Sequence, residues 1–393
     1  MEKKFKHTEI GLIPEDWEVK KLGEIGSFKK GRNIPKTKIQ EHGVPCVLYG
    51  EIYTKYNFYS EKLISRTSVE VAKSSTEIKK GDILFAGSGE TAEDIGKCFT
   101  YIGSENAYAG GDVIVFSPEK YNPLFLGFLL NSSTSVKQKS FLGQGSSVFH
   151  IYPSNLSKIQ IPLPPTKAEQ TAIATVLSDT DALIEKLEQL IAKKRLIKQG
   201  AMQELLKPKE GWEEKTLDDC TVCLDNLRVP LNETQRLSMK GDFPYCGANG
   251  ILDYINDYKI DDEIILIAED GGYFDEYAKR PIAYKMKGKC WVNNHAHILK
   301  AKPDFDQDFI FYSLVHKNIL TFLASGTRAK LNKSEMYKIL IHTPKQKEEQ
   351  TLIAQILSDM DNEIQELEKQ LEKYKMMKQG MMQVLLTGKV RLI

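Results

Sequence analysis

The side chains of this 393-residue chain that are best suited to chemistry include a group of thiols and imidazoles. Zn²⁺ prefers such ligands, and the group consists of Cys220, Cys223, Cys246, Cys290, His295 and His297. Cys220 and Cys223 form one C-x-x-C pair, but a zinc ribbon requires a second close pair, which the sequence lacks. We therefore expect no bound metal, and thiols that stay reduced rather than forming a disulfide framework.

The acids and the glycine-rich turns are the segments in which a catalytic centre would lie. Two groups of acids offer a nuclease centre on paper: Asp82, Glu90, Glu93 and Asp94, and Asp270 and Glu276 with Lys279. Scattered loop acids are more often solvated. The segment Gly87–Thr91 lacks the lysine of a phosphate-binding loop, and Leu163–Thr166 is not the Asn/Asp-Pro-Pro-aromatic tetrad that holds an extruded adenine. We expect no catalytic residue and no cofactor bound by this chain.

A third group of side chains is suited to reading DNA bases. Arg and Lys pair with guanine, Asn and Gln pair with adenine, and Ser, Thr and Tyr adapt to either. Candidates in the first half are Lys29, Lys30, Arg32, Lys36, Tyr49, Ser88, Thr91, Tyr108, Gln144 and Ser147. Candidates in the second half are Arg228, Arg236, Tyr245, Asn249, Lys279, Arg280, Asn293, Asn294, Arg328 and Lys330. For any single residue a surface or turn role is the simpler interpretation, so the prediction concerns the two sets.

The overall composition limits how such a chain would bind DNA. The formal net charge is only +1, although residues 29–40 and 277–303 are basic patches without acids. No apolar run approaches the roughly 20 residues that span a bilayer, and the N-terminus has no apolar segment of the secretory type. We therefore expect a cytoplasmic protein without a membrane association, whose phosphate contacts are local.

An internal repeat positions these side chains. Residues 169–206 and 349–386 share 20 of 38 positions at a constant offset of 180 residues. The similarity also includes Trp17 and Trp212 near the start of each copy. The chain is thus a tandem duplication of one variable block followed by one similar helix, with a period too long for a solenoid.

Each repeated helix carries a heptad pattern of apolar residues, which predicts a coiled-coil seam. The residues expected to pack are Leu177, Ile184, Leu187, Ile191, Leu357, Ile364, Leu367 and Leu371. Thr180 and Lys194 weaken the first seam, while Thr166 and Glu169 have capping-box spacing. Gly200 and Gly380 favour a kink or a helix end. About 40 residues give a helix roughly 60 Å long, which cannot bury its own stripe, so we expect the two copies to pack antiparallel.

The variable blocks are rich in predicted strands. Short apolar runs at residues 82–86, 113–116 and 264–268 are bounded by glycine or asparagine turns. We predict an α+β, mixed fold: two strand-rich α/β domains at 1–165 and 207–345, joined by long antiparallel helices at 166–206 and 346–393 in a pseudo-two-fold tandem repeat. Related scaffolds with divergent loops suggest related sites with different targets.

Several segments resemble the specificity subunits of type I restriction–modification systems. Ile10–Gly23 resembles the family's lead-in to its first target recognition domain, and Gly81–Phe85 resembles a strand of those domains. Pro162–Ala174 resembles the start of the central helical spacer, and Leu385–Leu392 resembles the usual C-terminal end. The likeness covers nearly the whole chain in the family's order.

The resemblance implies a non-catalytic subunit that reads a bipartite, asymmetric site in double-stranded DNA. It implies two methyltransferase subunits as partners, which use S-adenosylmethionine to methylate adenine, and motor-nuclease subunits that use ATP and Mg²⁺. Two alternatives stay open at this stage: a fused methyltransferase or nuclease of a related restriction system, and a coiled-coil adaptor without a DNA role.

Overall fold

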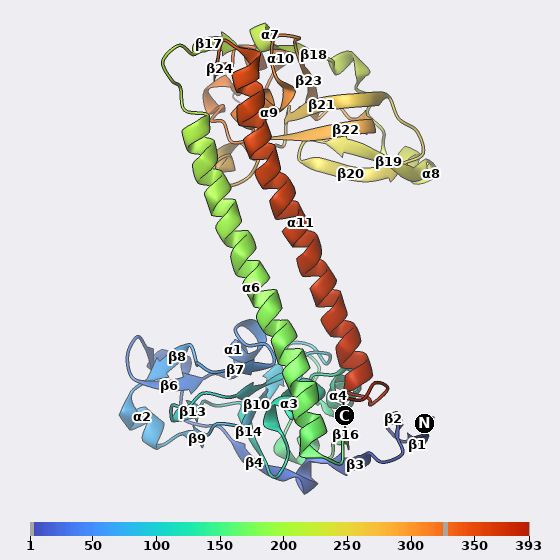
Figure 1. Cartoon of the computed structure of the whole chain (residues 1–393). Helices are drawn as coiled ribbons and strands as arrows, with labels where there is room; N and C mark the ends of the chain where they lie inside the picture. Colours follow the sequence, from blue (N-terminus) through green and yellow to red (C-terminus); the bar gives the residue numbers. More distant parts are fainter. Residues whose placement is uncertain (1–3, 325–328, 393) are drawn as a thin grey trace. The chain divides into compact units, whose positions relative to one another are not determined.

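The computed structural model of the chain describes residues 4–324 and 329–392. It divides into two compact units, of which unit 1 comprises Met1–Leu187 with Gln370–Ile393, and unit 2 comprises Glu188–Lys369. The two longest helices are α6 (Lys167–Leu205) and α11 (Lys347–Leu385), drawn in green and red in Figure 1. Each unit therefore contains a segment of α6 and a segment of α11.

Unit 1 is built on two five-stranded sheets. The first has the order β4-β14-β10-β12-β7, with β4 (Gly26–Lys30), β7 (Tyr59–Ser60), β10 (Ile83–Ala86), β12 (Cys98–Tyr101) and β14 (Val113–Pro118). The second has the order β5-β8-β6-β13-β9, with β5 (Ile39–Gln40), β6 (Val44–Val47), β8 (Ser65–Thr67), β9 (Thr76–Ile78) and β13 (Ala107–Ala109). Neighbouring strands are antiparallel, except that β7 is parallel to β12 and β6 is parallel to β13.

The first sheet is buried on both faces, which explains why β10 is apolar at every position. Ile83 and Phe85 face a core that includes α3 (Pro123–Leu130) and Leu177 of α6. Leu84 and Ala86 point the other way, into the core shared with the second sheet. Successive strand residues alternate between faces, so a doubly covered strand reads as a continuous apolar run.

The remaining elements of unit 1 are short. Its other helices are α1 (Tyr49–Thr54), α2 (Val69–Lys73), α4 (Ser133–Leu142) and α5 (Pro153–Leu156). Its two-stranded pairs are β1 (Phe5–Thr8) with β2 (Gly11–Pro14), β3 (Glu18–Lys21) with β16 (Gln160–Leu163), and β11 (Ser88–Gly89) with β15 (Phe149–His150).

Unit 2 contains one six-stranded sheet in the order β18-β23-β21-β22-β19-β20. The strands are β18 (Thr221–Cys223), β19 (Lys240–Gly247), β20 (Gly250–Ile255), β21 (Ile260–Ala268), β22 (Ala283–Val292) and β23 (Ala296–Ala301). Only β19 and β22 among these neighbours are parallel in the described residues. The pair β17 (Glu213–Thr216) and β24 (Leu340–Thr343) and the helices α7 (Leu217–Cys220), α8 (Glu233–Ser238), α9 (Gln307–Leu314) and α10 (Lys333–Met336) complete the unit.

The predicted fold class is confirmed: a tandem repeat of mixed α/β units with two long helices. The three predicted strands correspond to β10, β14 and β21. The prediction of a helix end near Gly200 or Gly380 is wrong, because α6 and α11 continue to Leu205 and Leu385. Leucines and methionines beyond each glycine pack on a core, which outweighs the cost of about 1 kcal/mol for a helical glycine.

The same polar contact fixes the start of both long helices. Gln170 is buried; its Oε1 accepts the backbone N–H of Asn122 at 2.9 Å and its Nε2 donates to Pro164 O at 3.2 Å. In unit 2, Gln350 makes the equivalent bonds to Asp306 N at 2.9 Å and Pro344 O at 3.1 Å. The Thr166 hydroxyl accepts the N–H of Glu169 at 3.2 Å, as half of the predicted capping box. The glutamine contacts tie α6 to the N-cap residue of α3, and α11 to the N-cap residue of α9.

A lysine–aspartate pair joins the two long helices within each unit, again at equivalent positions. In unit 1, Lys378 of α11 pairs with Asp181 of α6, and its Nζ lies 3.7 Å from the ring centroid of Phe58. In unit 2, Lys198 of α6 pairs with Asp361 of α11, whose other oxygen accepts the Tyr312 hydroxyl at 2.7 Å. Burial raises the pKa of Asp181 although Lys378 opposes it, and burial lowers the pKa of Lys378.

The predicted helix-packing residues lie along these segments. The buried ones are Leu177, Leu187, Ile191, Leu357 and Ile364. The half-buried ones are Ile184, Leu367 and Leu371. The polar seam position Lys194 forms an ion pair with Glu363 of α11 at 2.6 Å. Thr180 instead bonds back to Val176 O of its own helix at 2.8 Å.

The six cysteines are buried free thiols. Burial raises the pKa of Cys46 and of Cys220 to about 12, so these two side chains stay protonated at neutral pH. Among the described residues, no helix has both the length and the apolar composition needed to cross a membrane.

Lys378→Ala is expected to lower the free energy of unfolding by about 3 kcal/mol, because it leaves the half-buried Asp181 without its cation. Urea denaturation followed by circular dichroism measures the loss. Lys373→Ala, at an exposed position of the same helix, is the matched control and should change little. The double variant Lys378→Met with Asp181→Leu should recover most of the stability. Equal losses in the single and double variants would contradict this account.

Candidate nucleic-acid interface

Glycine-containing loops converge at one edge of the sheets in unit 1. Gly31 N donates to Val113 O at 2.7 Å, Gly87 N donates to Asp112 O at 2.7 Å, and Gly110 N donates to Val47 O at 2.9 Å. A Cβ on Gly31 would lie 2.1 Å from Gly110 O, so glycine is required for this approach. The loops thus form one surface, which we call the loop face of unit 1.

Several predicted residues of unit 1 are exposed around this loop face. Arg32 follows Gly31 directly, and its backbone N donates to Ala109 O at 3.2 Å. Lys30 lies at the end of β4 with its Nζ 3.8 Å from Asp112, and Tyr49 opens α1 with 40% of its surface exposed. The other exposed candidates are Lys29, Lys36, Gln144 and Ser147, and Tyr108 is half-buried in β13.

Two candidates in the same region are engaged internally. Ser88 is only 4% exposed, and its hydroxyl bonds to His150 Nδ1 at 2.9 Å. Thr91 donates to Asp94 Oδ2 at 2.8 Å within its own turn. In this conformation both hydroxyls serve the loop structure, and Ser88 presents little surface to a ligand.

Unit 2 has a corresponding convergence of loops. Asn293 N donates to Cys246 O at 3.0 Å, Glu269 N donates to His295 O at 2.9 Å, and Leu331 N donates to Glu269 O at 2.7 Å. The Asn249 side chain donates to Gly271 O at 2.9 Å. We call the surface made by Asn249, Gly271, Asn294, His295 and Lys330 the loop face of unit 2.

The predicted residues of unit 2 divide by exposure. Asn249, Lys279, Asn294 and Lys330 are exposed, and Arg280 stacks 3.0 Å above the ring centroid of Tyr273. Tyr245 and Asn293 are buried. Arg236 bonds to Leu231 O at 2.8 Å and lies 3.5 Å from Asp253. Arg328 lies outside the described residues.

A charge cluster lies at the loop face of unit 2, in which Arg228, Asp225 and Glu269 are half-buried and Lys330 is exposed. Arg228 pairs with Asp225 at 3.0 Å and with Glu269, and Lys330 pairs with Glu269 at 2.9 Å. Burial raises the pKa of Glu269, but the hydrogen bonds from Arg228 and Lys330 outweigh it and lower the pKa overall. Arg228 thus stabilises internal carboxylates in this conformation instead of facing solvent.

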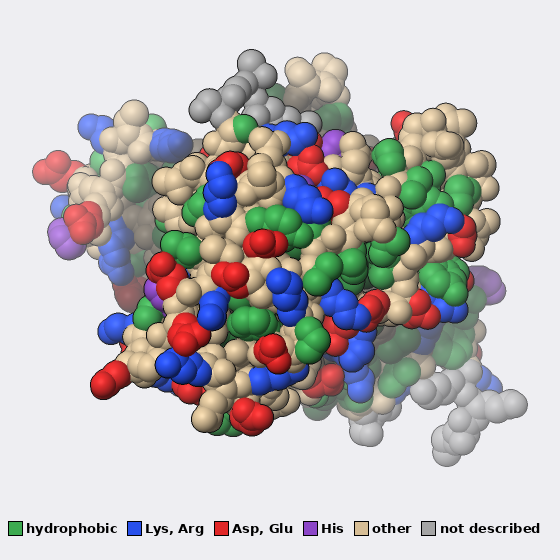
Figure 2. Space-filling view, turned by 90° about the horizontal axis from the view of Figure 1, so that it is seen from above, with side chains coloured by type: hydrophobic (Ala, Val, Ile, Leu, Met, Phe, Trp, Pro, Cys, Tyr) green, Lys and Arg blue, Asp and Glu red, His purple; other side chains and the backbone are tan. Residues whose placement is uncertain are grey.

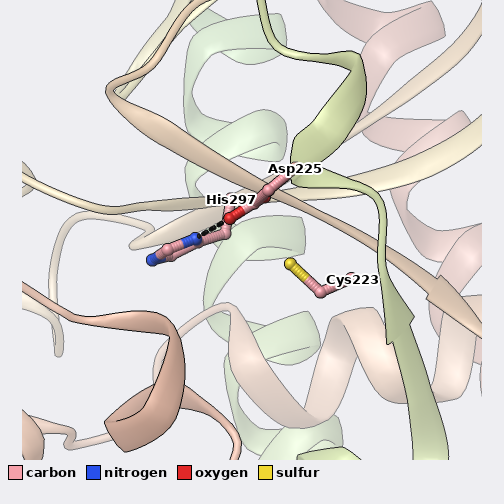
Figure 3. Close-up of side chains that lie close together, drawn as sticks. All are labelled: Cys223, Asp225 and His297. Atoms are coloured by element: carbon pink, nitrogen blue, oxygen red, sulfur yellow. Dashed lines mark hydrogen bonds and ion pairs between the residues drawn. The ribbon is translucent and has the colours of Figure 1, made fainter.

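His297 of β23 belongs to this cluster and lies beside Cys223 and Asp225, three groups whose ligand atoms are within 4.8 Å of one another. Figure 3 shows the imidazole pointing at the Asp225 carboxylate. His297 Nδ1 bonds to Asp225 Oδ2 at 2.7 Å, and Nε2 donates to Leu331 O at 2.8 Å. Asp225 also accepts Ile298 N at 3.0 Å and the guanidinium of Arg228.

These bonds make the cluster a poor metal site. Both ring nitrogens of His297 already have acceptors, and both oxygens of Asp225 already have donors. The hydrogen bond from His297 and the one from Ile298 overcome burial and lower the pKa of Asp225, while burial raises the pKa of the Cys223 thiol to about 11. Zn²⁺ binds the thiolate form of cysteine, and a thiol whose pKa is about 11 stays protonated at neutral pH, so Cys223 is a poor ligand.

Figure 2 shows one face of the surface, on which Lys and Arg side chains alternate with Asp and Glu side chains. This pattern agrees with the formal net charge of +1. A field of one sign does not cover the visible part, so DNA binding would depend on local contacts at the loop faces.

Sequence reasoning did not identify Glu269 and considered His297 only as a zinc ligand. The sequence did contain an indication of the structural role of His297: it lies within a buried strand, where a polar side chain requires hydrogen-bond partners. The repeated Gln170 and Gln350 were visible in the alignment of the two copies, but their role depends on contacts with distant residues.

This chain is similar to proteins of type I restriction–modification systems. The family model described as type I restriction modification DNA specificity domain matches twice, at residues 14–193 and 209–374. The MjaX specificity subunit of Methanocaldococcus jannaschii is 29% identical over 99% of this chain and 97% of its own length. The MjaVIII specificity subunit of the same organism is 26% identical over 99% and 96%. The S subunit of the M. genitalium type I restriction–modification system has the same fold, with a TM-score of 0.66, 19% identity and coverage of 98% and 99%.

Addition of Zn²⁺ or of a chelator is expected to leave the thermal unfolding temperature unchanged within about 1 °C, because a ligand stabilises only when it binds the folded state. Differential scanning fluorimetry of the full chain with EDTA, and then with equimolar Zn²⁺, tests this. Asp225→Asn serves as the control for binding at the cluster. A rise in the unfolding temperature with Zn²⁺ that disappears in Asp225→Asn would show that the cluster holds a metal.

Proposed function

Because this chain belongs to the type I restriction–modification DNA specificity family, we propose that its two units each read one half of a bipartite, asymmetric sequence in double-stranded DNA. As a specificity subunit it recognises DNA and is non-catalytic. This excludes the alternative of a fused methyltransferase or nuclease. We assign base reading to residues 1–165 and 207–345, and spacing to residues 166–206 and 346–393.

One observation carries the proposal: two related units present loop faces with different side chains. Unit 1 exposes Arg32 and Tyr49 at its loop face, whereas unit 2 exposes Asn249, Asn294 and Lys330. Guanidinium and ammonium groups pair with guanine, and amides pair with adenine, so Asn249 and Asn294 give the loop face of unit 2 a preference for adenine that Arg32 and Tyr49 do not give unit 1. A coiled-coil adaptor without a DNA role would not need two such surfaces.

The partners are two methyltransferase subunits, which dock on α6 and α11, and motor-nuclease subunits. The solvent-facing sides of both helices are available within each unit because the packed stripe is narrow. The partner subunits bind and use S-adenosylmethionine, ATP and Mg²⁺, and this chain binds no cofactor. Because its substrate is cellular DNA, the complex acts in the cytoplasm.

Sequencing of methylated adenines in a host that expresses the chain with its methyltransferase subunits tests the proposal. We expect one asymmetric motif with two specified halves separated by unspecified bases. Methylation without any sequence motif, or an unsplit motif, would contradict bipartite reading. The mapped motif also supplies the duplex for the binding experiments below.

Arg32→Ala is expected to weaken binding of the assembled complex to that duplex by about tenfold, since a charge-assisted contact contributes about 1 to 3 kcal/mol. If Arg32 contacts a phosphate, the loss is the same for all sequences and the salt slope falls by about 0.9. If it contacts a base, one position of the motif relaxes. Lys158→Ala, an exposed change outside the loop face, is the control. Unchanged affinity and motif for Arg32→Ala would remove Arg32 from the interface.

A fragment ending after Leu206 is expected to dimerise and, with methyltransferase subunits, to read a symmetric site. Its apolar stripe at Ile184, Leu187 and Ile191 needs a partner, and each buried aliphatic side chain contributes about 1.5 to 3 kcal/mol. Lys198 of a second copy corresponds to Lys378 by the repeat and matches Asp181. Light scattering measures the association, with Asp181→Asn weakening it. A strictly monomeric fragment at micromolar concentration would exclude the idea.

A further inference from the structure

The turn between β19 and β20 carries Asn249 at the loop face of unit 2. Gly247, the last residue of β19, pairs with Gly250, the first residue of β20, so only Ala248 and Asn249 connect the two strands. Gly250 has a φ of +127°, a conformation that favours glycine. Asn249 is exposed in this turn. Its position therefore depends on how the two glycine ends of the turn are held.

The hydroxyl of Tyr284 holds both ends of this turn. Tyr284 lies on β22, which neighbours β19, and its half-buried ring packs on an apolar cluster of the six-stranded sheet. The hydroxyl donates to Gly247 O at 2.6 Å and shares its proton with Gly250 O at 3.3 Å. The backbone bond from Asn293 N to Cys246 O, at 3.0 Å, attaches the end of β19 a second time. The turn is thus tied to β22 by one side chain and one backbone bond.

A carbonyl group of the neighbouring loop orients the Asn249 amide. Asn249 Nδ2 donates to Gly271 O at 2.9 Å, in the loop that follows β21. Because a carbonyl oxygen only accepts, the nitrogen end of the amide faces Gly271, and Nδ2 keeps a second N–H. The Asn249 side chain makes no other hydrogen bond to residues 4–324 or 329–392. Its remaining N–H and its Oδ1 suit N7 and the 6-amino group of adenine in the major groove.

We propose that Tyr284 is a positioning residue for the half-site read by unit 2: its hydroxyl fixes the β19–β20 turn so that the Asn249 amide pairs with one adenine. This inference rests on the proposed function. Pairing with adenine requires two hydrogen bonds at once, so a turn that can shift loses discrimination even though the side chain that touches the base is unchanged. Tyr284 acts through Asn249 and does not contact the base.

The experiment compares Tyr284→Phe with the unchanged chain, each assembled with its methyltransferase subunits. Phenylalanine keeps the ring in the apolar cluster and removes only the hydroxyl. Fluorescence anisotropy gives the dissociation constant for the duplex mapped by methylation sequencing, and for duplexes in which each A·T pair of both half-sites is replaced in turn by G·C. In Tyr284→Phe the preference for A·T should fall about fivefold at one pair of one half-site, the size of one hydrogen bond. Tyr254→Phe removes an exposed hydroxyl from β20 and should leave every preference unchanged.

Asn249→Ala and the double variant separate positioning from a merely structural role. Asn249→Ala should lower the preference at the same pair by about tenfold or more. Adding Tyr284→Phe to it should cause no further fall, because the hydroxyl acts through the amide. Asn249 is exposed, so this variant tests the reading of adenine whether or not Tyr284→Phe folds fully. Asn256→Ala, at an exposed position just after β20, is the matched control and should change nothing.

Four results would overturn the inference. They are an unchanged preference in Tyr284→Phe, a loss spread over several pairs or over both half-sites, an additive loss in the double variant, and an Asn249→Ala chain that keeps every preference. A structural role alone would give the second or the third of these. If the unchanged chain shows no preference for any mapped duplex, the proposed function itself fails, which is a distinct outcome.

Discussion

The structure depends on the need of two long helices to bury an apolar stripe. A 39-residue helix cannot cover its own stripe, and each unit answers this by combining a segment of α6 with a segment of α11. The Lys378–Asp181 pair in unit 1 and the Lys198–Asp361 pair in unit 2 occupy equivalent positions of the repeat. Such partly buried ion pairs add little net stability, but they penalise any register that leaves one charge unpaired.

The two copies share the contacts that attach each long helix to its unit, whereas their loops differ. Gln170 and Gln350 make the same two backbone contacts in the two units, although the sheets that they adjoin differ in strand number and order. Each glutamine bonds only to backbone groups in these contacts, and the side chains of the neighbouring strands take no part. The contacts therefore tolerate substitutions in those strands and in their loops. Different loop faces are therefore compatible with one shared mode of attachment to the helices.

The charge cluster at the loop face of unit 2 restricts the conformation of the surrounding loops. The cluster of Asp225, Glu269, Arg228, Lys330 and His297 satisfies its hydrogen bonds internally and connects β23 with the loops after β21 and before α10. A fully satisfied network of this kind favours one arrangement, since each alternative leaves a buried charge without a partner. The loops of unit 2 gain a defined shape without regular secondary structure.

The sequence by itself determined the duplication, the helix positions, the strands at the centre of each unit and the family, because these follow from periodicity and from identity at a fixed offset. It did not determine which candidates are free to meet DNA. Ser88, Arg228 and Tyr245 have the residue types of base readers, yet the fold encloses them, whereas Arg32 and Asn294 are exposed. It also did not show that a helix continues through Gly200. These outcomes depend on contacts between residues far apart in the chain, and a local pattern carries no information about which distant group will bury or pair a side chain.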